Sequence, residues 1–244
     1  MELIQKIKSI FNTAEVVELK KNVEFGFTIN WIKATKENPH HIIFTSGLSD
    51  NKQTVSDKYP EFENIELYFC LPEYWKVQDR SADYNWPIAW LNKIAQLPQK
   101  NKTWFGPGDT IPAGNPKEKI SSKLKQNNFI LSDPILFENQ LLNVNLDSKN
   151  VRFLSIIPIF EHEMSFKTRN SAKMLMTKYQ FSNYNEEVDE YRTSIVKFKK
   201  VSPFWIVIIL LSIAVGITAF FRVYNSDDSI LQKQNTTEIQ DTLK

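Results

Sequence analysis

Three carboxylates are the residues in this sequence best suited to acid/base chemistry. Glu161 and Glu163 flank His162 in the stretch EHE, and Asp109 ends the turn GPGD. Paired carboxylates support hydrolysis or group transfer when they face each other across a cleft, about 5 to 9.5 Å apart. One hypothesis is therefore a membrane-tethered hydrolase or transferase that uses Asp109, Glu161 and Glu163.

The EHE stretch does not make a metal or catalytic site by itself. If the apolar strand predicted over 151–160 continues through it, Glu161 and Glu163 point to one face and His162 to the other. The favoured interpretation is that the glutamates place negative charge at the start of the helix that follows. Three histidines and one cysteine in the whole chain are too few for a rich metal site, and we expect none.

Signatures of other chemistries are absent from the sequence. It holds no GxSxG, P-loop, dinucleotide-binding glycine pattern or HExxH. His40 and His41 open a predicted strand with opposite orientations, and we interpret them as packed or surface residues. The 30 basic and 28 acidic residues are spread along the chain, so no basic stripe indicates a nucleic-acid partner.

The segment WFGPGDTIPAGNP, residues 104–116, holds three of the six glycines and three of the eleven prolines of the chain. Gly106 and Gly108 permit positive φ, and Pro107 fixes its own φ. Asp109 can bond to the backbone two residues on, which predicts a structural turn. Alternatively, Asp109 presents its carboxylate to a partner at a rigid rim. Both interpretations can hold together.

Periodicity predicts the elements that position these residues. Strands are expected over 23–32, 40–46, 64–72 and 151–160, with shorter ones in NFILSDPILF and QLLNVNL. Helices are expected over 86–99, with Pro87 in its first turn, over 164–179, and in an amphipathic segment at 1–19. A last helix is expected in NEEVDEYRTSIVKFKK. The predicted fold class is α+β, with a mixed β-sheet and flanking helices, because strands and helices are segregated along the chain.

The stretch 203–221, PFWIVIILLSIAVGITAFF, contains no charged residue and predicts a C-terminal transmembrane helix. Pro203 and Phe221 bound it, and Phe204 and Trp205 supply the aromatic residues typical of a membrane boundary.

Charge near this stretch predicts its orientation. The segment 183–202 is a basic juxtamembrane linker, and 222–244 is a short polar tail. By the positive-inside rule, we expect a single-pass membrane protein whose N-terminal domain is cytoplasmic, with the lipid bilayer as one partner.

Five stretches in the same order carry a family resemblance: HIIFTSGLSD, ELYFCLP, WPIAWLNKIAQ, GPGDTI and FLSIIPIFEHEM. Together they resemble the Suppressor of fused (SUFU-like) domain family over residues 20–182. The resemblance implies a non-enzymatic, α+β, protein-binding domain. We therefore expect no catalytic residue, no cofactor and no small-molecule substrate. Eukaryotic members hold a short peptide as an added strand, and bacterial members are thought to be immunity proteins that neutralise toxins of polymorphic systems.

The resemblance also implies partner-binding residues. Asp109, preceded by Gly108, matches the aspartate that contributes to the peptide site of eukaryotic members. The aromatic partner of that aspartate falls near Leu97, which is not aromatic, and Trp104 completes the expected set. Because the eukaryotic C-terminal domain is missing, the chain resembles the bacterial kind, with a cognate toxin as partner. A scaffold for a membrane complex is the remaining alternative.

Overall fold

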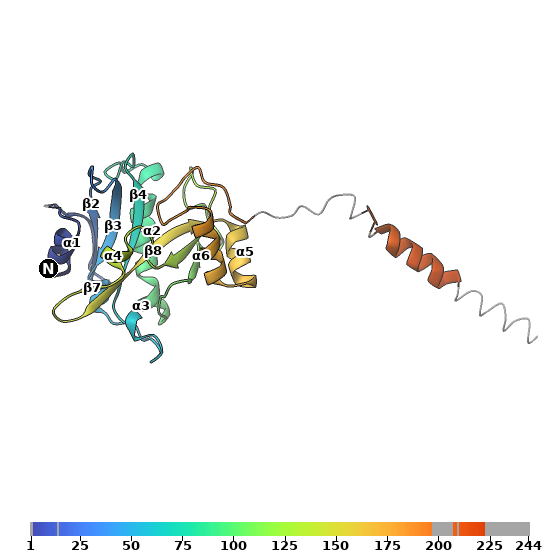
Figure 1. Cartoon of the computed structure of the whole chain (residues 1–244), viewed down its shortest axis with the longest axis horizontal. Helices are drawn as coiled ribbons and strands as arrows, with labels where there is room; N and C mark the ends of the chain where they lie inside the picture. The colour runs from blue at the N-terminus through green and yellow to red at the C-terminus, as the bar shows by residue number, and fades with distance from the viewer. Residues whose placement is uncertain (1, 14, 197–206, 209, 223–244) are drawn as a thin grey trace, which may run out of the picture. The chain divides into compact units, whose positions relative to one another are not determined.

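The structure is a computed structural model that describes residues 2–13, 15–196, 207–208 and 210–222. The chain divides into two compact units, Met1–Lys197 and Phe198–Lys244. The first unit contains the β-sheet and the helices that cover it (Figure 1).

The core of the first unit is an eight-stranded sheet with the order β1-β2-β3-β4-β8-β6-β5, with β7 paired to β8 off this path. The strands are β1 (Val17–Asn22), β2 (Phe27–Ile32), β3 (His40–Ser46), β4 (Ile65–Pro72), β5 (Thr110–Pro112), β6 (Asn128–Ser132), β7 (Val144–Asn145) and β8 (Asn150–Ile159). Only the β4–β8 pair is parallel among the strands described, and the others are antiparallel. The predicted α+β class with a mixed sheet is confirmed.

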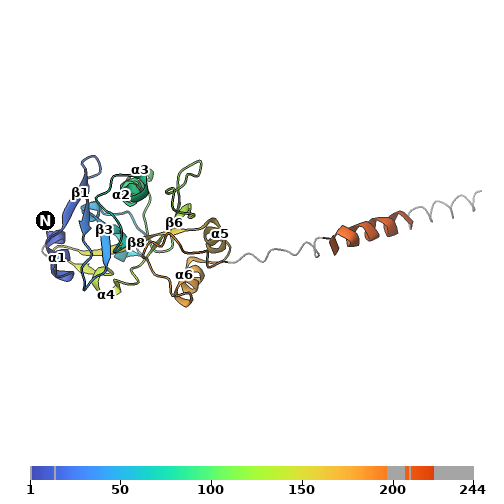
Figure 2. The same cartoon turned by 90° about the horizontal axis from the view of Figure 1, so that it is seen from above.

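Helices cover both faces of the sheet. They are α1 (Glu2–Ile10), α2 (Ala82–Ala95), α3 (Leu97–Asn101), α4 (Glu138–Leu141), α5 (Glu161–Arg169) and α6 (Ala172–Phe181), with 3-10 turns η1 (Leu48–Asp50) and η2 (Pro60–Phe62). Figure 2 shows α2 and α3 on one side and α1 and α4 on the other. Strand β4 is buried along its whole length because its alternate side chains enter both cores.

Several elements differ from the sequence-based expectation. The helix α1 ends at Ile10, and the strand β1 follows it at Val17. Pro87 lies inside α2, because that helix begins at Ala82. Strand β5 lies within the glycine- and proline-rich segment, where no strand was expected.

The edge strand β1 is irregular. Its pairing with β2 shifts between Glu18 and Lys20, where Leu19 is an extra residue. Lys20 and Lys21 then lie in the exposed part of this edge. A bulge and lysines at a sheet edge disfavour pairing with another chain.

The second unit corrects the prediction of a transmembrane helix over 203–221. Among the described residues, no helix combines the length and apolar character needed to cross a membrane. The expected single-pass topology with a cytoplasmic N-terminal domain depended on this transmembrane helix, so it is corrected for the same reason. Phe221 is an exposed helical residue, whereas Pro203, Phe204 and Trp205 lie outside the described residues.

After α6, the chain returns to the sheet as an extended segment, residues 184–196, which we call the return strap. The segment was expected to be helical. Its Glu187 instead forms a parallel bridge with Cys70, and Val188 N donates to the Cys70 carbonyl at 2.9 Å. The strap therefore lies beside the end of β4, beyond Tyr68, where β4 no longer pairs with β8.

The strap is held by a buried carboxylate at its start. Glu186 is completely buried and accepts hydrogen bonds from the Tyr68 hydroxyl at 3.0 Å and from the amides of Ile135 and Leu136 at 3.0 and 2.9 Å. Because these donors satisfy the carboxylate, its burial fixes the strap against β4 and the chain before α4.

Further along the strap, Arg192 forms a buried ion pair with Glu163 of α5. The two nitrogens Nη1 and Nη2 of Arg192 donate to Oε1 and Oε2 of Glu163 at 2.7 and 2.8 Å. Arg192 Nη2 also donates to the Tyr179 hydroxyl at 2.6 Å and to the Pro158 carbonyl at 2.7 Å. One guanidinium thus joins the strap to α5, α6 and the end of β8.

The charge of Arg192 decides the protonation of Glu163. Burial disfavours the Glu163 carboxylate, but the hydrogen bonds and charge of Arg192 outweigh it and lower the pKa of Glu163. The amides of Phe160 and Ile195 also donate to this carboxylate, at 2.9 and 3.0 Å. Both members of the pair are therefore charged, and their hydrogen bonds offset the loss of hydration.

We predict that Glu163→Gln lowers the free energy of unfolding by about 3–5 kcal/mol, because it leaves Arg192 buried without its counter-charge. Since the folded-state pKa of Glu163 is lowered, its stabilisation is present above the ordinary glutamate pKa and is lost as pH falls through the folded value. Denaturant unfolding measured across the acidic range should therefore show a weaker pH dependence in E163Q. The exposed Glu15→Gln variant is the control, and equal behaviour of the two variants contradicts the prediction.

Candidate functional site

Asp109 closes the turn that precedes β5. Its Oδ2 accepts a hydrogen bond from the Gly106 amide at 2.8 Å, and its own amide donates to the Gly106 carbonyl at 3.2 Å. The carboxylate therefore bonds three residues back, and not two residues on as expected. Asp109 is half-buried, and its Oδ1 has no protein hydrogen bond within the described part of the chain. Asp109 therefore has a structural role in the turn, and its Oδ1 remains available to accept a hydrogen bond.

The two glycines of this turn are required by close packing. Gly108 has φ +92°, and a Cβ there would lie 2.6 Å from the Cβ of Ala172 at the start of α6. A Cβ on Gly106 would lie 2.8 Å from the Trp104 ring. Trp104 itself stacks on Tyr59 and Phe62, with ring centroids 5.7 and 6.2 Å apart. Both glycines and Trp104 therefore have a structural role in the loop.

Strand β5 is an edge strand, and among the described residues its one strand partner is β6. The Asp109 carbonyl accepts from Leu131 N at 2.8 Å, and Ala113 N donates to the Asn127 carbonyl at 3.1 Å. Because antiparallel hydrogen bonding alternates along a strand, the backbone groups of Thr110 and Pro112 point away from β6. Thr110 thus offers a donor and an acceptor at the edge. Pro112 has no N–H, and its carbonyl already accepts from Gly114 N at 2.9 Å.

A hollow of about 530 Å³ adjoins this edge, between β5 and the helices α2 and α3, and we call it the β5 groove. Its apolar lining includes Trp90, Leu97 and Ile111, and its polar lining includes Lys93, Lys100 and Glu118. Lys93 and Lys100 are exposed, and Lys93 Nζ lies 4.5 Å from the centre of the Trp90 ring. The groove therefore has an apolar lining, with two exposed lysines and the exposed Glu118 among its polar residues.

The structure brings only some of the expected partner-binding residues to this groove. Leu97 lines it, and Gly108 and Asp109 directly precede β5. Trp104 is engaged with η2 and its neighbour Tyr59. Ile111 was not anticipated, because β5 was not predicted.

The three carboxylates of the hydrolase hypothesis are held by different partners. Glu161 forms an ion pair with Lys117 and accepts from Asn128 Nδ2 at 3.1 Å. The Lys117 contact, followed by that of Asn128, lowers the pKa of Glu161. Glu163 is buried against Arg192, and Asp109 is bonded within its own turn. Because Glu163 Oε2 accepts from the Phe160 amide at the start of α5, the prediction that this stretch caps the helix is confirmed for Glu163.

His40 and His41 point to opposite faces of β3, as the sequence predicted. His41 is buried, and its Nδ1 accepts from Ala34 N at 2.8 Å and from Trp31 Nε1 at 3.2 Å. Since Nδ1 accepts twice, Nε2 carries the proton and donates to the Glu73 carbonyl at 3.2 Å. Burial lowers the pKa of His41 and keeps it neutral.

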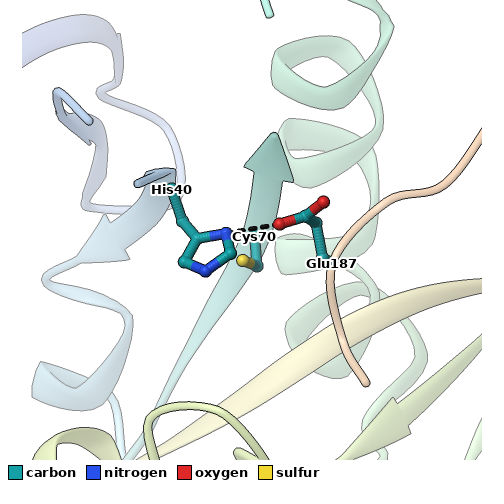
Figure 3. A group of neighbouring side chains, drawn as sticks. All are labelled: His40, Cys70 and Glu187. Carbon is teal, nitrogen blue, oxygen red and sulfur yellow. Dashed lines mark ion pairs between the residues drawn. The ribbon is translucent and has the colours of Figure 1, made fainter. Parts of the chain in front are cut away.

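His40, on the other face, contacts Glu187 of the return strap next to Cys70 (Figure 3). No sequence spacing predicts this cluster, because its members come from three separate segments. The only local signals are that His40 and Cys70 lie on predicted strands.

The fold is thus that of a single mixed-sheet α+β domain with helices on both faces. The chain belongs to the Suppressor of fused protein (SUFU) family, whose family model matches residues 26–193. Curated proteins show no significant sequence match to the chain.

Solved structures share the fold at low sequence identity. A SUFU (suppressor of fused protein) homolog from Neisseria gonorrhoeae aligns with a TM-score of 0.61 and 18% identity, covering 81% of this chain and 96% of that one. A structure of the Sufu-Fu complex aligns with a TM-score of 0.57 and 15% identity, covering 79% and 90% of the two chains. Drosophila Suppressor of Fused has a TM-score of 0.57 and 14% identity, with 80% of this chain matching 50% of that chain.

We predict that Gly108→Ala lowers the free energy of unfolding by at least about 1–3 kcal/mol, because it forces positive φ on alanine and a Cβ against Ala172. In an Ala172→Gly background the same change should destabilise less. The clash with the Ala172 Cβ is then removed, and only the cost of a positive φ at alanine remains. A thermodynamic cycle from denaturant unfolding measures the difference. Equal losses in both backgrounds would show that the contact with α6 plays no part.

Proposed function

We propose that this chain is a protein-binding module that takes up an extended segment of a partner polypeptide along the β5 edge and the β5 groove. The observation that carries the proposal is the edge itself, where Thr110 directs its backbone N–H and C=O outward beside an apolar hollow. Addition of a strand pairs such groups, and the neighbouring groove receives alternate side chains of the added segment.

The chemistry of the groove defines the segment that it suits. The apolar lining favours aliphatic or aromatic side chains, and the exposed Lys93 and Lys100 favour acidic residues next to them. Because Pro112 has no N–H, full backbone pairing is limited to Thr110. Side-chain contacts in the groove therefore supply most of the affinity and the specificity.

Asp109 is proposed as a further contact at the start of the edge. Its Oδ2 is committed to Gly106, while Oδ1 can accept a hydrogen bond from a partner's amide or hydroxyl. The fixed turn holds this oxygen in place before binding, so little conformational entropy is lost on docking. Gly108 and Leu97, which the family resemblance also implies for partner binding, lie at the same edge and groove. Trp104 supports the loop by stacking on Tyr59 and Phe62.

We further propose that the partner is a toxin of a polymorphic toxin system and that binding neutralises it. Two observations support this finer assignment. The family resemblance implies such a role for bacterial members, and the fold match extends over 96% of the Neisseria protein but 50% of the Drosophila protein. The Sufu-Fu complex is an instance in which a protein of this fold is found with another protein.

The binding face is tested by matched charge reversals at the two sheet edges. We expect Lys93→Glu with Lys100→Glu to weaken binding of the proposed cognate toxin by at least about tenfold, equivalent to about 1.4 kcal/mol. The same double reversal at Lys20 and Lys21, on the β1 edge, should leave the Kd within about threefold. Calorimetry with the full chain measures both. Equal weakening at the two edges would reject the β5 groove as the site.

Neutralisation is tested separately from binding. Co-expression of the full chain with the toxin should restore growth, and the Lys93/Lys100 variant should restore less of it. Binding without restored growth would reject the immunity role and leave the binding module standing. Absence of binding to every protein encoded by the neighbouring genes would reject the toxin as partner.

A further inference from the structure

Three potential metal ligands from three segments meet at the end of β4. His40 opens β3, Cys70 lies in β4, and Glu187 lies in the return strap. The sheet register explains the meeting: Cys70 pairs with Ile42 on one side and Glu187 on the other, and His40 lies two residues before Ile42 on the same face. Figure 3 shows the imidazole, the thiol and the carboxylate directed toward one another.

The ligand atoms are close enough for one ion. A ring nitrogen of His40, Cys70 Sγ and a Glu187 carboxylate oxygen all lie within 4.8 Å of one another. Around a tetrahedral zinc ion, bond lengths of about 2.0–2.3 Å place the ligand atoms about 3–4 Å apart. Small side-chain rotations therefore suffice to bring the three atoms to coordination distance.

The surroundings fix these side chains but leave one side open. The edge of the Phe137 ring packs against His40, with centroids 5.9 Å apart at 86°. Cys70 is completely buried, whereas the side chains of His40 and Glu187 are 21% and 29% exposed. His40 Nδ1 is itself buried and lacks a hydrogen bond of good geometry, although it is in ion-pair contact with Glu187. A metal cation bound at His40 Nδ1 would give this buried nitrogen a partner.

We propose that His40, Cys70 and Glu187 bind one divalent transition-metal ion, with Zn²⁺ as the best-suited ion, and that this ion fastens the return strap to β3 and β4. Imidazole nitrogen, thiolate sulfur and carboxylate oxygen are all zinc ligands, and a water molecule can take the fourth position on the open side.

Binding requires that the thiol lose its proton. Burial, with the nearby Glu186 and Glu187 carboxylates, raises the pKa of Cys70, so the free thiol is neutral at pH 7. As the sulfur–metal bond forms, the proton passes to solvent, and no electron transfer is involved. The positive charge of the metal ion then takes the place of the lost proton and neutralises the Cys70 thiolate and the Glu187 carboxylate.

The simpler alternative is an ion pair between protonated His40 and Glu187 that holds the strap without a metal. Such a pair accounts for His40 and Glu187 but assigns no role to the sulfur beside them. The two arrangements differ in a measurable way, because only the metal site contains a metal–thiolate bond.

Cobalt(II) titration of the full chain, free of any histidine tag, tests the proposal. We expect one equivalent of Co²⁺ to give a thiolate charge-transfer absorption, which Zn²⁺ then displaces. Because Cys70 is the only cysteine of the chain, this absorption reports on Cys70 alone. Zn²⁺ should also raise the unfolding temperature of the full chain.

Variants separate the metal site from the ion pair. We expect Cys70→Ala to abolish the absorption, and His40→Gln and Glu187→Gln to weaken Zn²⁺ binding by at least about tenfold. His162→Ala, at a distant position, is the control and should bind as the wild type does. His40 and Glu187 are partly exposed, so their variants remain informative if C70A does not fold. Absence of the charge-transfer absorption in the wild type, or equal loss in H162A, would overturn the proposal.

Discussion

The buried ion pair between Glu163 and Arg192 is the interaction on which the second half of the domain depends. A charged pair inside a protein is stable only if its hydrogen bonds replace the lost hydration, and here both carboxylate oxygens and both terminal guanidinium nitrogens have partners. Those partners come from β8, α5, α6 and the return strap. The same pair holds both carboxylate oxygens of Glu163 and keeps them charged, so Glu163 is not placed for acid/base chemistry.

Sequence patterns predicted the parts of the fold that depend on local periodicity. Strand β3 coincides with the predicted segment 40–46, and β4 with 64–72 to within one residue. The capping role of Glu163 was also readable, because it concerns the chain three residues away. Its ion pair was not, since Arg192 lies 29 residues further on and only the fold brings it back. Family membership could be recognised because it depends on the order of several such segments.

The failures have specific physical causes. Apolar composition over 203–221 measures the tendency to leave water, but it does not by itself establish a helix that crosses a membrane. Strand β5 is three residues long and includes Pro112, so only its pairing with β6 defines it. The cluster of His40, Cys70 and Glu187 has no sequence spacing of its own, because cross-strand register assembles it. The β5 groove was likewise not predicted, although Leu97, which lines it, is one of the expected partner-binding residues.

The two ends of the sheet are chemically unequal. The β1 end has a displaced register and two lysines, whereas the β5 end has a short open edge beside an apolar hollow. Continuous cross-β growth needs two compatible edges on every copy, and the sheet in the described part of the chain offers one at most. A polypeptide that docks on the sheet therefore terminates the array, so strand exchange yields a closed complex of defined stoichiometry and not a filament.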